Sequence, residues 1–469
     1  MTLQDDQNKF QQFRQELYQN FNKRADTALE LLDALCGFPE AESPVQLTLS
    51  PEFRRTYTAL YKAVDETNWK DISPAQLVAA AVPRPKRYPF WLLALDVTSQ
   101  PRPFAQTLTD RGFVYAPNSI GRNKPITIGH QYSTVVLRTE KEPRMTKSWV
   151  VPLSVRRVAT DEDKELTGAH QIRELLEDPT LPWHGELTVE VGDTSYSKPA
   201  YLYANRDYDH LVTVARVRSN RTFYRQFVYP DGQRPAHRPQ RYGAAFKLPD
   251  PTTWHAPDET TQFCYTSRRG KQYTVVIQGW YNLLMPGKNK PERIPMGKYP
   301  FTLVRVTVYR EDGTRAFKRP LWLIAVGKRR AALSLADIYA AYAARVDIEH
   351  FFRFGKQRLL LTDFQSPKTE SEERWWHIVH LAYTMLWMAR QLAHHLPRPW
   401  EKYLDAAQRR EISPTLVQRD FARLIRQLGT PAQPPKPRGK SPGRPPGLEL
   451  PPRPRRNVVF KGEKAAAGA

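Results

Sequence analysis

Three acidic residues occur in the order Asp, Asp, Glu, each beside a segment with a regular hydrophobic pattern. Asp96 ends the apolar run 90–95, where we expect a strand to leave the sheet, and Asp193 closes the strand-like run 187–192. Glu349 lies on a helical pattern that follows a long β-rich stretch. Oxygen-only ligation suits Mg²⁺ or Mn²⁺. If the three acids converge on one edge of a sheet, they fit phosphoryl transfer with two divalent metal ions about 3.5 to 4 Å apart.

Both aspartates also have a purely structural interpretation. Asp96 would cap the following turn if the strand ends there, and Asp193 would cap a helix that begins near Ser195. Glu190 is an alternative acid on the same strand as Asp193, but alternation along a strand points it to the opposite side. The pattern alone leaves a catalytic and a structural role open for each aspartate.

The region of the third acid has a more specific pattern. Tyr342, Arg345, Glu349 and Lys356 follow one another at spacings of 3, 4 and 7 residues. On one continuous helix, this spacing confines all four side chains to about 60° of one face. The carboxylate would bind metal while the cations hold phosphate oxygens. A solvated helix face with an Arg345–Glu349 ion pair is the alternative.

Composition indicates a polyanionic partner. The chain has 469 residues and 71 Lys and Arg against 48 Asp and Glu, which gives a formal charge of +23. Such an excess favours nucleic acid or an anionic membrane. The sequence has neither an apolar run of about 18 residues nor a signal-like start, so we expect no membrane association and a cytoplasmic, nucleoid-associated location. Cys36 and Cys264 are too few for a disulfide framework.

The hydrophobic patterns predict an α/β fold because strand-like and helix-like segments alternate between residues 86 and 220. A capping box of Ser334 and Asp337 opens one long helix that we expect to run through about residue 360. The predicted segments are a helical N-terminal domain for DNA binding at 1–85, the first part of the core at 86–220, a β-rich insertion at 221–320, the second part of the core at 321–395, a helical segment at 396–429, and a disordered, basic, proline-rich tail at 430–469.

Taken together, these residues resemble the DDE transposases of bacterial insertion sequences. One branch of that family carries tyrosine, two residues, arginine, three residues, glutamate, six residues and lysine on its catalytic helix, and residues 342–356 match it at every spaced position. The resemblance covers about residues 86–395. It implies a ribonuclease H-like mixed sheet flanked by helices and interrupted by the β-rich insertion. It also implies that Asp96, Asp193 and Glu349 hold two Mg²⁺ or Mn²⁺ ions.

The resemblance further implies double-stranded DNA as partner, both the terminal inverted repeats of a transposon and the target, with a homodimer on the DNA. The phosphate contacts would come from Tyr342, Arg345 and Lys356. Three arginines past a predicted strand, Arg216, Arg218 and Arg221, are further candidates, although a charge run is also typical of a solvated face.

The sequence departs from the family at two points. The first motif lacks the doubled aspartate of many relatives, because Asp96 follows leucine. Family members also use an aromatic residue near the insertion to handle a flipped base. Trp280 is a candidate, but a strand tryptophan is more often part of the core, so that role is not assigned.

Three functions fit the pattern. A cut-and-paste transposase would hydrolyse a phosphodiester at the element end and use the freed 3′ hydroxyl to attack target DNA. A nuclease of the same fold would cleave without joining strands. A catalytically silent DNA-binding descendant of a transposase is the third, and the intact set of acids argues against it.

Overall fold

The computed structural model describes residues 2–70, 72–116, 125–146, 149–229, 239–267, 269–287, 293–396, 398–405, 408–437, 439, 443, 445–449 and 451–462. The chain forms two compact units, each built from separated segments. Unit 1 comprises 1–83, 97–164 and 347–469, and unit 2 comprises 84–96 and 165–346. Strand β1 (Trp91–Pro101) passes from unit 2 into unit 1 directly after Asp96.

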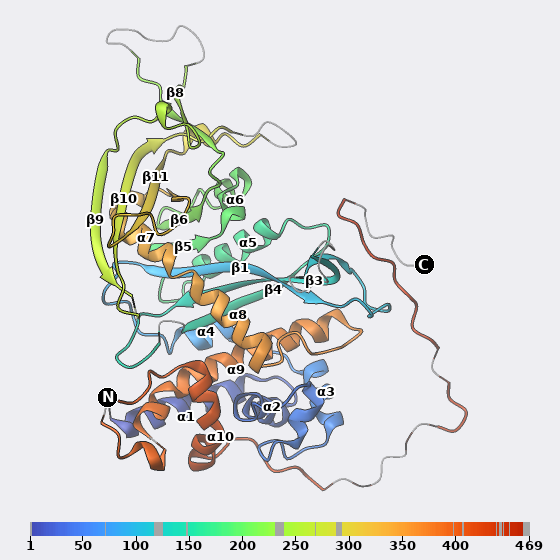
Figure 1. The fold of residues 1–469 in the computed structure, drawn as a ribbon. Helices are drawn as coiled ribbons and strands as arrows, with labels where there is room; N and C mark the ends of the chain where they lie inside the picture. Colours follow the sequence, from blue (N-terminus) through green and yellow to red (C-terminus); the bar gives the residue numbers. More distant parts are fainter. Residues whose placement is uncertain are drawn as a thin grey trace. The chain divides into compact units, whose positions relative to one another are not determined.

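Unit 2 is built on a mixed sheet in the order β1, β5, β6, β12, β11, β10, β9 (Figure 1). The first three are parallel and the others join antiparallel. Valine, isoleucine and leucine dominate the central strands, whose side chains are buried on both faces, as expected for a covered sheet. The strand bounds are β5 (Thr188–Gly192), β6 (Leu211–Arg216), β9 (Glu259–Thr266), β10 (Gln272–Leu283), β11 (Phe301–Arg310) and β12 (Leu321–Val326).

Helices cover this sheet, and β7 pairs with β8 in a separate hairpin. Helix α7 packs against β10 at Gly279, where a Cβ atom would lie 2.7 Å from the Leu335 side chain, so the close approach requires glycine. The remaining bounds are α5 (Lys164–Glu177), η2 (Thr194–Ser197), α6 (Pro199–Ala204), β7 (Thr222–Gln226), β8 (Tyr242–Lys247), η3 (Pro251–Thr253), η4 (Met296–Lys298), η5 (Arg330–Ala332) and α7 (Leu335–Ala343).

Unit 1 combines the long helix α9 with the N-terminal helices and with strands β2 to β4. Helices α1, α2 and α3 pack on α9, and α10 packs on α2 and α9, so the N-terminal helices share one core with the C-terminal ones. The bounds are α1 (Leu3–Asn20), α2 (Ala25–Gly37), η1 (Pro44–Leu49), α3 (Tyr57–Glu66), α4 (Pro74–Ala79), β2 (Gly112–Tyr115), β3 (Ile126–Arg138), β4 (Val150–Val158), α8 (Val346–Arg358), α9 (Thr369–His395), η6 (Pro399–Glu401) and α10 (Pro414–Leu428).

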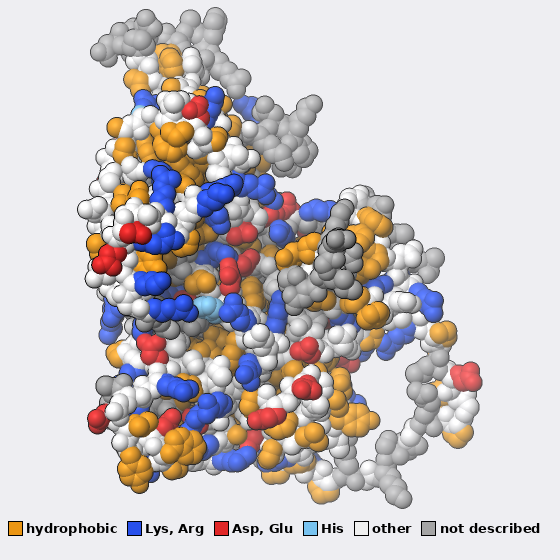
Figure 2. Space-filling model, viewed as in Figure 1, with side chains coloured by type: hydrophobic (Ala, Val, Ile, Leu, Met, Phe, Trp, Pro, Cys, Tyr) orange, Lys and Arg blue, Asp and Glu red, His pale blue; other side chains and the backbone are white. Residues whose placement is uncertain are grey.

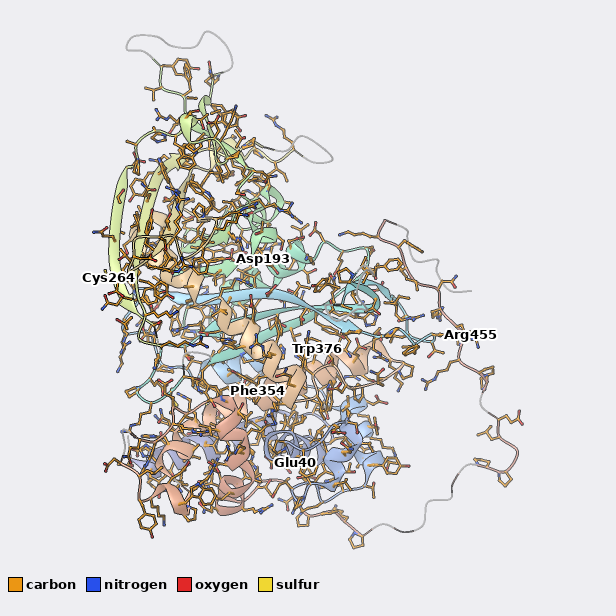
Figure 3. The ribbon with its side chains drawn as sticks, viewed as in Figure 1. Glu40, Asp193, Cys264, Phe354, Trp376 and Arg455 are labelled. Carbon is orange, nitrogen blue, oxygen red and sulfur yellow. The ribbon has the colours of Figure 1, made fainter. Side chains whose placement is uncertain are left out.

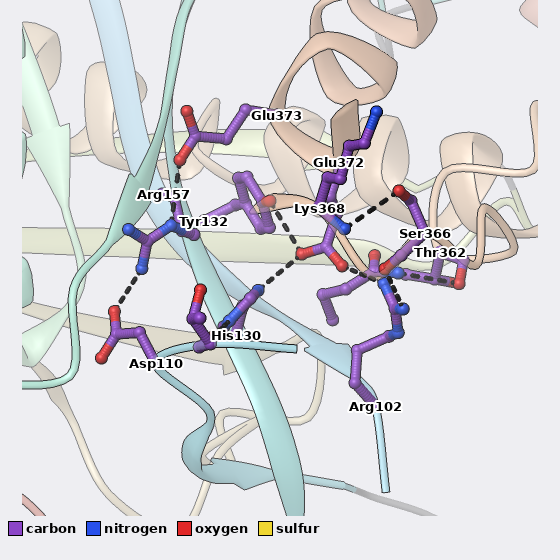
Figure 4. Close-up of polar contacts among 12 residues, drawn as sticks. Arg102, Asp110, His130, Tyr132, Arg157, Thr362, Ser366, Lys368, Glu372 and Glu373 are labelled. Atoms are coloured by element: carbon purple, nitrogen blue, oxygen red, sulfur yellow. Dashed lines mark hydrogen bonds and ion pairs between the residues drawn. The ribbon is translucent and has the colours of Figure 1, made fainter. Parts of the chain in front are cut away.

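The buried carboxylate of Glu372, on α9, contacts residues at the end of β1 and on strand β3. Glu372 is fully buried and pairs with Arg102, which directly follows β1 (Figure 4). From β3, His130 Nδ1 and the Tyr132 hydroxyl donate to the same carboxylate, at 2.7 and 2.8 Å. Because a buried charge is costly unless it is paired, this network fixes the relative positions of these three elements of unit 1.

The predicted fold class is confirmed: the chain is an α/β protein with a large mixed sheet flanked by helices, consistent with a ribonuclease H-like fold. The core strands follow the order β4, β3, β1, β5, β6. Of the predicted insertion, β9, β10 and β11 extend the sheet of unit 2. Within the part of the chain that is described, no helix is long and apolar enough to cross a membrane.

The prediction of one continuous helix from Ser334 is wrong. The capping box is present, but the helix ends at Ala343, and a turn at residues 344 and 345 precedes α8. Valine and isoleucine flank Asp347, and all three have low helix propensity. Asp347 also lies in the first turn of α8, where the helix dipole favours a carboxylate, and it pairs with Arg138 of β3. A second helix start is therefore favoured here.

Two further expectations differ from the structure. Asp96 is not at a strand end, because β1 continues to Pro101 and its second half adjoins β3.

In the tail, the Arg456 and Val459 amides donate to the carbonyls of Gln106 and Arg111, at 2.7 and 2.8 Å. This part of the tail is therefore held against unit 1, although other tail residues lie outside those described.

Candidate active site

Asp96 of unit 2 is bound by an arginine from the predicted signature. Arg345, in the turn after α7, donates from Nη1 to Asp96 Oδ2 at 2.9 Å. The two side chains are 15% and 23% exposed. A partly buried, charge-assisted bond of this kind holds both groups in place while leaving them accessible to a ligand. The pair joins residues that are 249 positions apart in the chain.

Asp193 follows β5 and caps the short helix η2 (Figure 3). Its Oδ1 accepts hydrogen bonds from the Ser195 amide at 2.7 Å and from the Ser195 hydroxyl at 2.6 Å. The capping role that the sequence left open is therefore present. It does not exclude a second role, because a carboxylate has two oxygens and about four lone-pair sites.

Asp96 and Asp193 both affect the pKa of one buried tyrosine, Tyr196. Burial raises the pKa of Tyr196, and the negative charges of Asp96 and Asp193 raise it further. The tyrosine ring folds back on the end of β5, where a Cβ on Gly192 would lie 2.6 Å from it. The first two predicted acids therefore lie near the same side chain of unit 2.

Tyr342 belongs to the same neighbourhood. Burial raises its pKa, Arg345 and Arg216 lower it, and Asp193 raises it. Arg345 thus lies near both Asp96 and Tyr342, and Tyr342 lies within electrostatic range of Asp193. These predicted residues come together within unit 2, although the helical face that was expected to carry them does not exist.

Glu349 and Lys356 lie on α8, in unit 1. Glu349 is exposed. Lys356 is half-buried and donates from Nζ to the hydroxyl of Thr98 at 2.7 Å, and burial lowers the pKa of this lysine. Thr98 is two residues beyond Asp96 on β1, so the lysine of the signature is bound to the strand that carries the first acid.

The carboxylates of the three predicted acids are ligands of the kind that Mg²⁺ and Mn²⁺ prefer. In the described part of the chain, no group of three or more His, Cys, Asp or Glu side chains is arranged to hold a metal ion. Asp96 and Asp193 nevertheless supply carboxylate oxygens from one region of unit 2, and Mg²⁺ is commonly held by one or two carboxylates together with substrate phosphates. Glu349 belongs to unit 1, so its place as third ligand stays a prediction.

The three predicted arginines near β6 differ in their surroundings. Arg216 and Arg218 are exposed, as a DNA contact requires. Arg221 is half-buried: it donates to the Met285 sulfur at 3.5 Å and lies over the Phe223 ring. Burial lowers its pKa, and so does the neighbouring Arg218. Lys and Arg side chains also gather on the visible face of unit 2 (Figure 2).

Trp280 is a core residue. It is 1% exposed, and its indole nitrogen donates to the His255 carbonyl at 3.0 Å. Its ring contacts Phe246, Trp254 and Trp322. The side chain is therefore enclosed by the aromatic core of unit 2, in agreement with the interpretation of a strand tryptophan as core.

Sequence reasoning missed Thr98 and Tyr196. Thr98 could have been found, because alternation along a strand places it on the same side as Asp96. For Tyr196 the only local signal is Gly192, which permits the ring to fold back on the strand end. Glu190, the alternative acid, is fully buried and accepts hydrogen bonds from the hydroxyls of Tyr201 and Thr213, so it belongs to the core of unit 2.

A comparison with known families identifies the family of the chain. A family model described as DDE superfamily endonuclease matches residues 16–280, which is more than half of the chain. The chain therefore belongs to the DDE superfamily of endonucleases, enzymes that act on DNA and typically use divalent metal ions. The matched region includes Asp96 and Asp193 and ends before the signature of residues 342–356. No curated protein matches the chain.

Proposed function

We propose that this chain is an insertion-sequence transposase of the branch with the Tyr-Arg-Glu-Lys signature. It cleaves DNA at the ends of a transposon and transfers the cut strand into target DNA, as a cut-and-paste element requires. The observation that carries the proposal is the ion pair between Arg345 and Asp96. It links the signature, which lies beyond the matched family region, to an acid within that region.

In this proposal Asp96, Asp193 and Glu349 hold two Mg²⁺ or Mn²⁺ ions. When bound, such ions activate the attacking oxygen and stabilise the leaving oxygen of a phosphodiester. The donor types fit, and the electrostatic effect of both Asp96 and Asp193 on Tyr196 supports a shared site for the first two carboxylates.

The cations of the signature bind the DNA backbone. Arg345 presents a guanidinium beside Asp96, and a phosphate oxygen at this position would compete for the same N–H donors. Lys356 is positioned by Thr98 and contributes a point charge. Tyr342, which lies within electrostatic range of Arg345, is a further phosphate contact of the signature, while Arg216 and Arg218 extend the basic surface.

Two reactions follow in order. In the first, water attacks a phosphorus atom at the element end, the P–O3′ bond breaks, and a 3′ hydroxyl is released. In the second, this hydroxyl attacks a target phosphodiester, and the target 3′ oxygen leaves. The substrates are terminal inverted repeats and target duplex, the acting form is a homodimer on DNA, and the location is the cytoplasm beside the bacterial nucleoid.

The deciding experiment uses DNA ends that are already cut, with Mg²⁺ or Mn²⁺ and a labelled target duplex. A transposase joins the labelled end to the target in a metal-dependent reaction. A nuclease of the same fold nicks uncut ends but gives no joined product. A silent DNA-binding descendant gives neither product, and either of the last two results would overturn the proposal.

A further inference from the structure

Strand β9 is the outermost strand of the sheet in unit 2. It pairs with β10 along its whole length, and no strand in the described part of the chain pairs with its other edge. All but one of its residues are exposed. Figure 1 shows β9 at the margin of unit 2, and Figure 3 marks Cys264 on it. As far as the described residues go, one edge of this strand is therefore available for hydrogen bonding.

The backbone groups on that edge can be assigned from the hairpin with β10. The Ser267 amide donates to the Lys271 carbonyl at 2.8 Å. Because successive residues of a strand direct their N–H and C=O groups to alternate sides, the odd-numbered residues of β9 face β10. The even-numbered residues, which include Gln262 and Cys264, direct theirs to the outer edge.

Beyond its first residue, Glu259, strand β9 lacks the side chains that normally prevent pairing. Natural edge strands carry lysine, proline or bulges, but residues 260–266 contain no charged residue, proline or glycine. They are threonine, glutamine, phenylalanine, cysteine and tyrosine, most of which favour strands. In a chain of charge +23, such a neutral strand is a place where two copies can approach with little repulsion.

The charges beyond each end of the strand are opposite in sign. Asp258 and Glu259 stand at its start, and Arg269 and Lys271 follow its end. Antiparallel pairing of β9 with β9 of a second copy brings the acidic end of each beside the basic end of the other. With Cys264 opposite Cys264 of the second copy, Gln262 lies opposite Thr266, and the acidic start of each strand lies toward the hairpin turn of the other copy, which contains Arg269. The strand is thus self-complementary under a two-fold axis.

We propose that a second copy of this chain docks on β9 by antiparallel strand pairing, which joins the two sheets into one. The interface goes beyond the proposed function, because it forms without DNA and without cleavage. Backbone hydrogen bonds from the even-numbered residues supply the contact, and the terminal charges set the register.

The first test measures mass by sedimentation velocity on protein freed of nucleic acid. Wild type should form a dimer of the 54.3 kDa chain. Gln262→Pro removes an outward N–H without removing a bond to β10, and proline is tolerated on edge strands. It should weaken dimerisation at least about tenfold, since symmetry removes two hydrogen bonds. Gln262→Ala keeps the N–H and should stay within about twofold. Circular dichroism confirms that both variants fold.

The second test uses Cys264 as a probe of register. Directly opposed residues in a hydrogen-bonded antiparallel pair have Cα atoms about 5.5 Å apart, which a disulfide can span. The oxidant diamide should therefore produce a covalent dimer of wild type and of Cys36→Ala, because Cys36 is buried. Cys264→Ser should give none.

Four results would overturn the proposal. Wild type could stay monomeric at every concentration, or its dimer could be unaffected by Gln262→Pro. Gln262→Ala could weaken the dimer as much as proline does, which would indicate side-chain contacts instead of strand pairing. Dimers could also appear only after DNA is added, which would assign the association to the nucleic acid. None of these results depends on whether the chain transposes DNA.

Discussion

Arg345 donates a hydrogen bond to Asp96 at 2.9 Å, from a turn between two helices to the middle of a strand. Neither residue is placed by its own element alone. The turn exists because α7 ends at Ala343 and α8 begins at Val346, and this break directs Arg345 toward the sheet of unit 2. Arg345 was expected on a helix face. It contacts Asp96 instead, because the helix is interrupted before it.

Replacing Arg345 tests its role as a phosphate contact. Arg345→Ala should weaken binding to a cut DNA end by roughly 1 to 3 kcal/mol, as expected for a charge-assisted bond, and should slow strand joining. The free energy of unfolding should fall by about 1 to 3 kcal/mol, because the substitution leaves a mostly buried carboxylate without this partner, so binding is measured on protein shown to be folded. Arg353→Ala removes an exposed arginine of α8 and serves as the control. Equal effects from both would show that only net charge matters.

The buried acid of β5 predicts a pH dependence of stability. Burial raises the pKa of Glu190 to about 7 from an ordinary value of 4.5. Between these values the folded protein retains a proton that the unfolded chain has lost, so the free energy of unfolding should fall by about 3 kcal/mol as pH rises from 4.5 to 7. Urea titrations across this range should show the fall in wild type.

Glu190→Gln provides the comparison, since an amide cannot ionise. Its unfolding free energy should vary less with pH over the same window, while Glu311→Gln in an exposed hairpin turn should follow wild type. An unchanged pH profile in Glu190→Gln would contradict the assignment of a protonated carboxyl in the core of unit 2.

How much of the fold the sequence could predict depends on how far apart the interacting residues are in the sequence. Local patterns predicted β10 and the capping box at Ser334, because both follow from neighbouring residues. The break before α8 could not be predicted, since it involves the pairing of Asp347 with Arg138, 209 positions away. The extension of β1 past Asp96 likewise depends on its distant partner strands.

In the candidate site too, the sequence predicted the residue types but not the contacts that depend on tertiary structure. The residue types and order of the acids predicted a metal-dependent DNA enzyme, in agreement with the family. The sequence did not reveal that Asp193 caps η2, although it left that interpretation open, or that Tyr196 lies near both aspartates. Such contacts depend on how a loop folds back, which hydrophobic periodicity does not encode.

The tail is expected to bind DNA without sequence preference. Its basic side chains alternate with prolines and include Arg438, Lys440, Arg444, Arg453, Arg455 and Arg456. Deletion of 434–469 should make the salt dependence of DNA binding shallower, because each phosphate contact contributes about 0.9 to the slope of log affinity against log salt. Deletion of 463–469, which removes one acid and one base, is the control. An identical slope for all three proteins would exclude the tail from DNA binding.

Glu349→Gln separates cleavage from binding. The substitution keeps the shape of the side chain but removes the charge that would hold a divalent ion, so metal-dependent cleavage should disappear. DNA affinity should stay equal or rise slightly, because repulsion from phosphate falls. Gel-shift and nicking assays on the same preparation measure both. Wild-type cleavage by this variant would remove Glu349 from the metal site.

The most direct measurement of the central claim is the metal-dependent cleavage rate of Asp193→Asn. Asparagine retains a carbonyl oxygen that can accept the two hydrogen bonds from Ser195, and it is as good a helix cap as aspartate. The fold and melting temperature should therefore be preserved, while the charge needed for a divalent ion is lost. The account predicts a folded protein that binds DNA and does not cut it with Mg²⁺ or Mn²⁺. Cleavage at the wild-type rate would show that Asp193 is a cap only and would contradict the proposed active site.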